Sequence, residues 1–248
     1  MANHRRCNVI LCYVCYSEAV RGRDVTGKTS FHHFVAMGDL DSLSKLSLYY
    51  LPAEDYDTDG VTLLMYSCAR TEAGQMTVTR YLVETLRVDV TAVDSLKRNA
   101  LMHAVLASNQ EALVYLLESG NYFLADDKDG VNPLMVACAK GNQAIADILL
   151  QSKGAKDLAI RTDNSRRNAF HFSAMNGHLG CVSLLKAHHC DINARDERGR
   201  TALVYAIRGG HFEMVAPFVR RGADVNLCDN LQQSALHHCF DVTTPNVK

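Results

Sequence analysis

The sequence predicts an all-α solenoid of stacked helix pairs, because one unit recurs along its 248 residues. First, seven aspartates follow one another at separations of 33, 37, 33, 36, 33 and 33 residues: Asp24, Asp57, Asp94, Asp127, Asp163, Asp196 and Asp229. Second, five residues after each aspartate stands a Thr, Asn or Ser, residue types that cap helix N-termini. Third, two residues further stands a large apolar residue. One unit cannot bury these apolar positions alone, so neighbouring units must stack.

The sequence predicts the same order of structural elements in each unit. The turn that begins at the aspartate has its fourth residue as glycine in four units and as Lys97, Arg166 or Gln232 in the other three. A short first helix then follows the capping residue, which is Thr29, Thr62, Asn99, Asn132, Asn168, Thr201 or Ser234. After a glycine break, as at Gly141, comes a second amphipathic helix, whose apolar stripe in the sixth unit is Met214, Val215, Phe218 and Val219. We therefore expect paired antiparallel helices with protruding turns.

The chain is expected to contain six full repeats, at residues 24–228, with half-repeats at both ends. Residues 1–23 align with a second helix and predict an N-terminal capping half-repeat. Residues 229–248 predict an incomplete C-terminal repeat that has only a first helix. The two longer spacings predict insertions near Arg70–Gly74 and Leu86–Val88 in the second unit, and near Gln151–Asp157 in the fourth.

Short motifs in these units resemble those of the ankyrin repeat family. Segments similar to its Thr-Pro-Leu-His signature are Thr29-Ser-Phe-His32, Asn132-Pro-Leu-Met135, Asn168-Ala-Phe-His171 and Ser234-Ala-Leu-His237. Segments similar to its Gly-Ala-Asp-Val-Asn signature are Gly222-Ala-Asp-Val-Asn226 and Cys190-Asp-Ile-Asn193. The resemblance covers about Val9 to Phe240. It implies an ankyrin-repeat solenoid that acts as a non-catalytic protein–protein interaction module and binds a partner on a concave face made of turn tips and first helices.

Composition narrows the classes of partner. The 26 Lys and Arg nearly balance the 27 Asp and Glu, which argues against a bulk polycation for nucleic acid or an acidic membrane surface. The apolar stretch from Val9 to Tyr16 is too short to span a bilayer. It faintly resembles a secretory signal, but the half-repeat alignment argues against that interpretation. Nine cysteines, an odd number without a disulfide spacing, indicate a reducing cytoplasmic location. We expect a monomer with a protein partner and no nucleic acid or membrane.

The sequence carries few signs of chemistry. His4, Cys7, Cys12 and Cys15 could be metal ligands, but no second pair of ligands follows at the usual distance. The histidines of the Thr-Pro-Leu-His-like segments are expected to be structural, because the family uses them so between repeats. Phosphate loops, nucleophile elbows and Rossmann glycine patterns are absent from the sequence. We therefore expect neither enzymatic activity nor a cofactor.

The resemblance places the partner-binding candidates on turn tips and first helices. They are Tyr56, Asp126, Lys128, Arg167, Arg195, Arg198, Arg200 and Arg208. Arginines dominate units five and six, so one interpretation is a docking strip for an acidic or phosphorylated segment, since Arg pairs bidentately with carboxylate and phosphate. The other interpretation is a solvated basic surface without a partner.

Two rival functions remain open at this point. The chain could be the regulatory or substrate-recruiting ankyrin domain of a longer enzyme, such as a kinase, a ubiquitin ligase or a membrane acyltransferase. It could also carry a metal-dependent N-terminal module built on the residues from His4 to Cys15.

Overall fold

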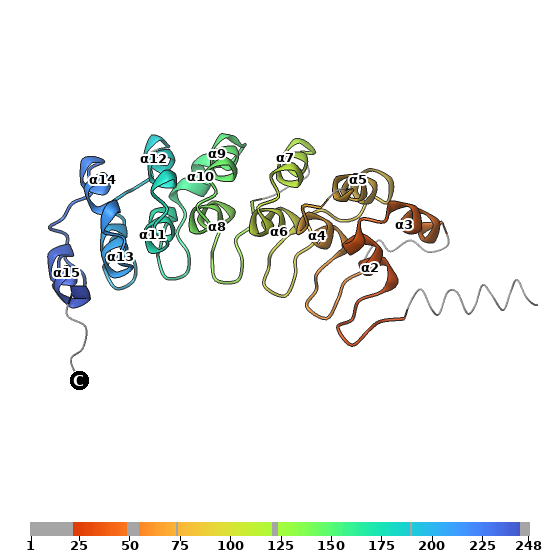
Figure 1. The fold of residues 1–248 in the computed structure, drawn as a ribbon, viewed down its shortest axis with the longest axis horizontal. Coiled ribbons are helices and arrows are strands. Elements are labelled where there is room, and N and C mark those ends of the chain that lie inside the picture. The colour runs from red at the N-terminus through yellow and green to blue at the C-terminus, as the bar shows by residue number, and fades with distance from the viewer. Residues whose placement is uncertain (1–21, 49–54, 73, 121–123, 189, 244–248) are drawn as a thin grey trace, which may run out of the picture. The chain divides into compact units, whose positions relative to one another are not determined.

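The fold is an all-α array of helix pairs, as the repeat predicts. The computed structural model describes residues 22–48, 55–72, 74–120, 124–188 and 190–243. Within these ranges the regular structure is helical, and the exception is an isolated bridge between Tyr56 and Thr62. The chain divides into two compact units, residues 1–123 and residues 124–248. In each unit the first helices form one row, the second helices form another, and the turns project from the row of first helices (Figure 1).

The first unit contains three helix pairs. Its first helices are α2 (Ser30–Met37), α4 (Leu63–Cys68) and α6 (Ala100–Ala107). Its second helices are α3 (Leu40–Ser47), α5 (Gln75–Arg80), which continues as a π-helix over Tyr81–Thr85, and α7 (Gln110–Glu118). Helix α4 packs against α2 on one side and α6 on the other.

The second unit contains three pairs and a further first helix. Its first helices are α8 (Pro133–Ala139), α11 (Ala169–Met175), α13 (Ala202–Arg208) and α15 (Ala235–Thr243). Its second helices are α9 (Gln143–Gln151), α12 (Leu179–Ala187) and α14 (Val215–Arg220), the last preceded by a 3-10 turn over Phe212–Met214. One short helix, α10 (Ala155–Ile160), follows α9 outside this pattern.

All seven capping residues stand where the sequence predicts, directly before a first helix. The side chains of Asn99 and Asn132 accept the N–H groups of Met102 and Met135, at 3.0 and 2.9 Å. Ser234 makes a different bond: its own N–H donates to Nδ1 of His237 at 3.1 Å. Each bond satisfies a polar group at a helix start that would otherwise have no partner inside the helix.

The apolar column that follows the caps forms the core. Phe31, Leu64, Leu101, Leu134, Phe170 and Leu203 are 0 to 2% exposed. Leu236, the same position in α15, is 66% exposed, because no second helix follows α15 in the part of the chain that the structure describes. The N-terminal half-repeat predicted for residues 1–23 lies almost wholly outside the described residues.

The two insertions take different forms. The insertion in the fourth repeat folds into α10. The insertion in the second repeat is partly taken up by the π-helix, which accommodates an extra residue within a helical turn. A third irregularity is in the sixth repeat, where Pro217 lacks the N–H that would bond to the Glu213 carbonyl, so the second helix begins as a 3-10 turn.

Candidate functional site

Every turn is organised by the carboxylate of its aspartate. Oδ1 of each of the seven aspartates accepts the N–H groups of the residues two and four positions later, at 2.7 to 3.0 Å. The residue between these two has φ of 60 to 78° in every turn. Neighbouring turns are joined by backbone hydrogen bonds, such as Glu197 N–H to the Ser165 carbonyl at 3.0 Å. The turns of each unit thus form a bonded row.

The other carboxylate oxygen, Oδ2, holds side chains that project from the turn and the first helix. Asp94 binds Arg98 and His103, at 2.9 and 3.0 Å. Asp196 binds Arg200 and the hydroxyl of Tyr205, at 2.8 Å each. Burial raises the pKa of these carboxyls, but the hydrogen bonds from the arginine, from the backbone and from His103 or Tyr205 outweigh it and lower the pKa of both. Burial, together with the hydrogen bond to Asp196, raises the pKa of Tyr205 to about 12.

Two of the predicted docking arginines are engaged within their own turns. Arg167 forms an ion pair with Asp163 at 2.6 Å and lies over the Phe172 ring at 4.9 Å. Arg200 pairs with Asp196 and lies 4.7 Å from the centre of the Tyr205 ring. Their side chains are 27% and 16% exposed. Each guanidinium group is therefore fixed in place and presents only an edge to solvent.

The remaining candidates in the second unit differ in whether their charged groups have hydrogen-bond or ion-pair partners. Arg195 donates to the carbonyls of Gly199 and Cys228, at 3.0 and 2.7 Å. Asp126 pairs with Arg161 at 3.2 Å, and Nη1 of Arg208 lies 3.4 Å from Nδ1 of His238. Lys128 and Arg198 are exposed, and within the described ranges their side chains make no hydrogen bond or ion pair.

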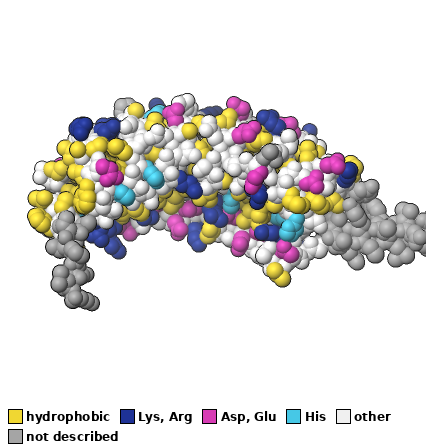
Figure 2. Space-filling model, in the orientation of Figure 1, with side chains coloured by type: hydrophobic (Ala, Val, Ile, Leu, Met, Phe, Trp, Pro, Cys, Tyr) yellow, Lys and Arg dark blue, Asp and Glu magenta, His cyan; other side chains and the backbone are white. Residues whose placement is uncertain are grey.

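Tyr56 stands apart because it belongs to the first unit, whereas the other seven candidates belong to the second. It is 55% exposed, and the Arg23 guanidinium lies 5.8 Å from the centre of its ring. On the face shown in Figure 2, basic and acidic side chains are interspersed, in keeping with the balanced composition.

Sequence reasoning missed the inward bonding of these arginines. The sequence does carry a signal of this bonding, which is the spacing Asp-x-x-x-Arg. This spacing occurs at Asp94, Asp163 and Asp196, with an aromatic residue or histidine five positions after the arginine. In the folded turn the N–H of the fifth residue binds the carboxylate, so the side chain of that residue starts beside it.

Among the motif histidines, His171 has the contacts expected of a structural residue. His171 is fully buried, and its Nδ1 accepts the N–H of Asn168 at 3.1 Å. Because that nitrogen accepts, Nε2 carries the proton and donates to the Arg200 carbonyl at 3.1 Å. Burial lowers the pKa of His171. The ring therefore links its own helix cap to the next repeat in its neutral form.

The cysteines of the repeats are free thiols, and four of them, Cys68, Cys138, Cys181 and Cys190, are buried. Burial raises the pKa of the Cys68 thiol to about 12, so that it stays protonated. His4, Cys7, Cys12 and Cys15 lie outside the described residues. Inside the described residues no group of three or more His, Cys, Asp and Glu side chains could hold a metal ion.

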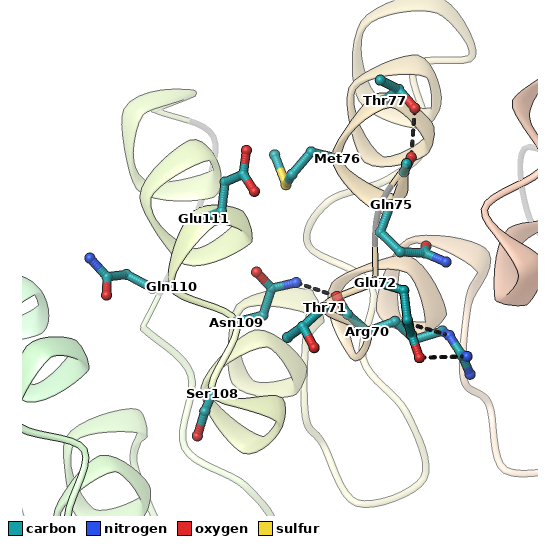
Figure 3. Close-up of a pocket in the computed structure, with 11 residues that line it drawn as sticks. Arg70, Thr71, Glu72, Gln75, Met76, Thr77, Ser108, Asn109, Gln110 and Glu111 are labelled. Atoms are coloured by element: carbon teal, nitrogen blue, oxygen red, sulfur yellow. Dashed lines mark hydrogen bonds and ion pairs between the residues drawn. The ribbon is translucent and has the colours of Figure 1, made fainter.

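The first unit also contains a polar pocket of about 410 Å³ between the start of α5 and the start of α7 (Figure 3). Met76 and Glu111 face each other across it. Arg70 and Glu72 on its wall form a bidentate ion pair at 2.8 and 3.0 Å, and Nδ2 of Asn109 donates to the Cys68 carbonyl at 3.2 Å. Arg70 and Glu72 thus neutralise each other, and the Asn109 amide is held by the backbone of the neighbouring repeat.

Comparison with known proteins agrees with this architecture. A sequence model described as ankyrin repeats (3 copies) matches residues 31–127, 69–159, 113–196 and 170–242. The chain is similar to potassium channel AKT2/3 of Arabidopsis thaliana, at 29% identity over 55% of the chain and 17% of the channel. It is similar to the probable E3 ubiquitin-protein ligase XBOS33 of Oryza sativa subsp. japonica, at 32% identity over 42% of the chain and 20% of that protein. It is also similar to an L-asparaginase of Dirofilaria immitis, at 25% identity over 89% of the chain and 37% of that protein.

The chain thus matches a minor part of each of these relatives, which are larger proteins. No helix among the described residues is both long enough and apolar enough to cross a membrane. Ankyrin repeat domains are in general protein-interaction modules. With its repeated motifs, its helix pairs and the four overlapping matches over residues 31–242, the chain belongs to the ankyrin repeat family.

Proposed function

We propose that the chain is a non-catalytic module that binds an acidic or phosphorylated segment of a partner protein through its second unit. The binding surface, called the basic face below, consists of Arg167, Phe172, Arg198, Arg200, Tyr205 and Arg208. The observation that carries the proposal is that two of its guanidinium groups are fixed against aromatic rings while Arg198 stays exposed beside them.

Fixed arginines favour binding of an anionic segment for two reasons. Little side-chain freedom remains to be lost when a partner docks, so less of the interaction energy is offset by ordering. The guanidinium group also has five N–H donors, and those not used by Asp163 or Asp196 remain for a carboxylate or phosphate.

The charge of the basic face supports an acidic partner. Its four arginines meet two buried aspartates, Asp163 and Asp196, so two positive charges are in excess. Arg198 and Arg208 supply that excess, because the other two arginines are paired. The protein would therefore recognise its partner by local charge, although the whole chain is nearly neutral.

The test is recovery of partner proteins by the tagged full chain from the cells that make it. The double variant Arg198→Glu and Arg208→Glu reverses both exposed charges, and we expect it to lose most of the recovered partner. Recovery by the unaltered chain should also weaken as salt is added. The matched control is Lys156→Glu with Lys186→Glu, the same change of charge on exposed residues of α10 and α12. Equal recovery by the test and control variants would contradict the proposal.

A second candidate function is that of a recruiting domain within a longer protein, including an enzyme. The observation that favours it is that the chain spans only 17 to 37% of the three relatives named above. Sequencing the full transcript tests this candidate, since it requires a further domain on the same polypeptide.

We also propose a reducing compartment for the protein, because the six described cysteines are all free thiols. Titration of thiols in the freshly isolated, denatured chain tests this, and disulfides among them would contradict it.

A further inference from the structure

A groove on the second unit is separate from the basic face. It has a volume of about 370 Å³ and lies between the segment that follows α10 and the segment that precedes the next turn. Ile160, the last residue of α10, and Thr162 line one side of it. Asp191, Ala194 and Arg195 line the other side, and Arg166 lines it from the turn. We call this cavity the linker groove. None of the six residues of the basic face lines it.

Arg166 is the free cation of the linker groove. It is exposed, and among the residues that the structure describes its side chain has no hydrogen bond or ion pair. Its backbone is fixed, with φ of 61° and an N–H that donates to the Asp163 carbonyl at 2.9 Å. At Gly130, the same position one repeat earlier, an added Cβ would point at Asn164 of the following turn. By the same geometry the Cβ of Arg166 points toward the turn that begins at Asp196, and the Arg166 side chain lines the groove that lies just before that turn.

The other charges at the groove are already engaged. Arg195 is held by the carbonyls of Gly199 and Cys228. Asp191 accepts the N–H of Asn193 at 2.9 Å, and its own carbonyl accepts Nδ2 of Asn168 at 2.8 Å. The two arginines and one aspartate leave a single positive charge in excess at the groove.

An apolar contact lies beside this charge. Ile160, the last residue of α10, is 71% exposed although it is a large aliphatic side chain. An aliphatic side chain in this position gains free energy when a partner covers it. The groove thus combines one unpaired guanidinium with one uncovered aliphatic surface.

We propose that the linker groove binds an extended segment of a partner protein in which an Asp or Glu adjoins an apolar residue. The carboxylate pairs with Arg166, and the apolar side chain covers Ile160. A singly charged carboxylate neutralises the single excess charge, whereas a phosphate dianion would leave a net negative charge in the groove. This inference rests on the proposed function of protein binding and adds a second site to it.

The test is a titration of the isotope-labelled full chain followed by NMR of its backbone amides. The probes are three blocked tripeptides: acetyl-leucyl-glutamyl-leucyl-amide, its glutaminyl analogue and its phosphoseryl analogue. With the glutamyl peptide we expect saturable shifts at the amides of Ile160, Thr162, Arg166 and Arg195. The glutaminyl peptide should bind about tenfold more weakly, the loss of one charge-assisted hydrogen bond. The phosphoseryl peptide should bind no more tightly than the glutamyl peptide.

Two variants give the matched comparison. Arg166→Gly keeps the backbone conformation and removes the guanidinium, so the glutamyl peptide should lose about tenfold in affinity. Lys97→Gly removes the same charge at the same turn position in the first unit, where φ is 60°, and should leave the affinity unchanged. Equal loss in both variants, or tighter binding of the phosphoseryl peptide, would overturn the proposal.

Failure here can be told apart from failure of the proposed function. Shifts confined to Phe172, Arg198 and Arg208 would overturn the linker groove and support the basic face. Absence of any saturable shift would also overturn the linker groove. The proposed function would still be tested by the recovery of partner proteins, an experiment that uses other variants and no peptide.

Discussion

Arg200 and Arg198 lie two residues apart in one turn and differ in what holds them. Arg200 bonds to Asp196 and Tyr205, whereas the Arg198 side chain is exposed. Removing Arg200 leaves a buried carboxylate without its cation, which costs about 1–3 kcal/mol. We therefore expect Arg200→Ala to lower the free energy of unfolding by that amount, measured by urea denaturation. Arg198→Ala should change it by no more than about 0.5 kcal/mol. Equal effects would show that the ion pair does not stabilise the turn.

Three residues with side chains occupy a left-handed position that four repeats give to glycine. Lys97, Arg166 and Gln232 have φ of 60, 61 and 60°. This backbone costs a residue with a Cβ about 1 kcal/mol relative to glycine, although glycine also loosens the unfolded chain. We expect Arg166→Gly to raise the melting temperature slightly, and Gln232→Gly to do the same. A clear fall in either variant would mean that the side chain stabilises its turn by more than the strain.

Buried histidines should make the protein sensitive to mild acid. Burial lowers the pKa of His171 in the folded state, so the unfolded chain takes up a proton first as the pH falls below about 6.5. Stability is then lost as the pH decreases from 6.5 toward the lowered pKa. His171→Gln should reduce the loss between about pH 7.5 and 5.5, measured by denaturation at each pH. His237→Gln, at the same motif position but exposed, is the control, and identical pH profiles for all three proteins would exclude this role.

These residues show what could be predicted from the sequence. The aspartate and capping columns predicted the seven turns and the start of each first helix, because both act through bonds to backbone within a few residues. The contacts of the arginine side chains could not be predicted in the same way. Whether Arg167 points to a partner or to Asp163 depends on the folded turn and on the Phe172 ring beside it.

At the scale of elements, α15 differs from the other first helices of the second unit in the exposure of its apolar side chains. Leu236 and Phe240 are 66% and 65% exposed, whereas the equivalent of Leu236 in α11, Phe170, is fully buried. An uncovered large apolar side chain forgoes about 1.5–3 kcal/mol. We expect the backbone amides from Gln232 onward to exchange with deuterium before those of Ala169–Met175. Equal protection of the two segments would show that another surface, in this chain or a second copy, covers α15.

The second helices show which features could not be predicted from the spacing of residues in the sequence. Spacing predicted insertions in the second and fourth repeats. It could not show that the one in the fourth becomes α10, or that a π-helix forms over Tyr81–Thr85, between the two places predicted for the other. Those outcomes depend on packing of the inserted residues against neighbouring helices, which leaves no periodic trace in the sequence. In the sixth repeat the cause is a single residue, since Pro217 has no N–H to bond to the carbonyl of Glu213.

At the scale of the molecule, contacts follow the order of the repeats. Within each unit the first helices of neighbouring repeats pack on one another, as α11 does on α8 and α13. Such proteins present a large surface without a single deep site, so partner choice depends on which side chains stand on that surface. In the second unit the basic face and the linker groove are two such places, and they share no residue.

The most direct test of this account is a hydrogen-exchange footprint of the full chain in complex with its recovered partner. The basic face predicts that exchange slows at the amides of residues 163–172 and 196–208 when the partner is bound. Protection in these segments should disappear in the variant with Arg198→Glu and Arg208→Glu, while the free variant keeps the exchange pattern of the free chain. Protection confined to the second helices α9, α12 and α14 would contradict the account, since it would place the partner on the opposite row of helices.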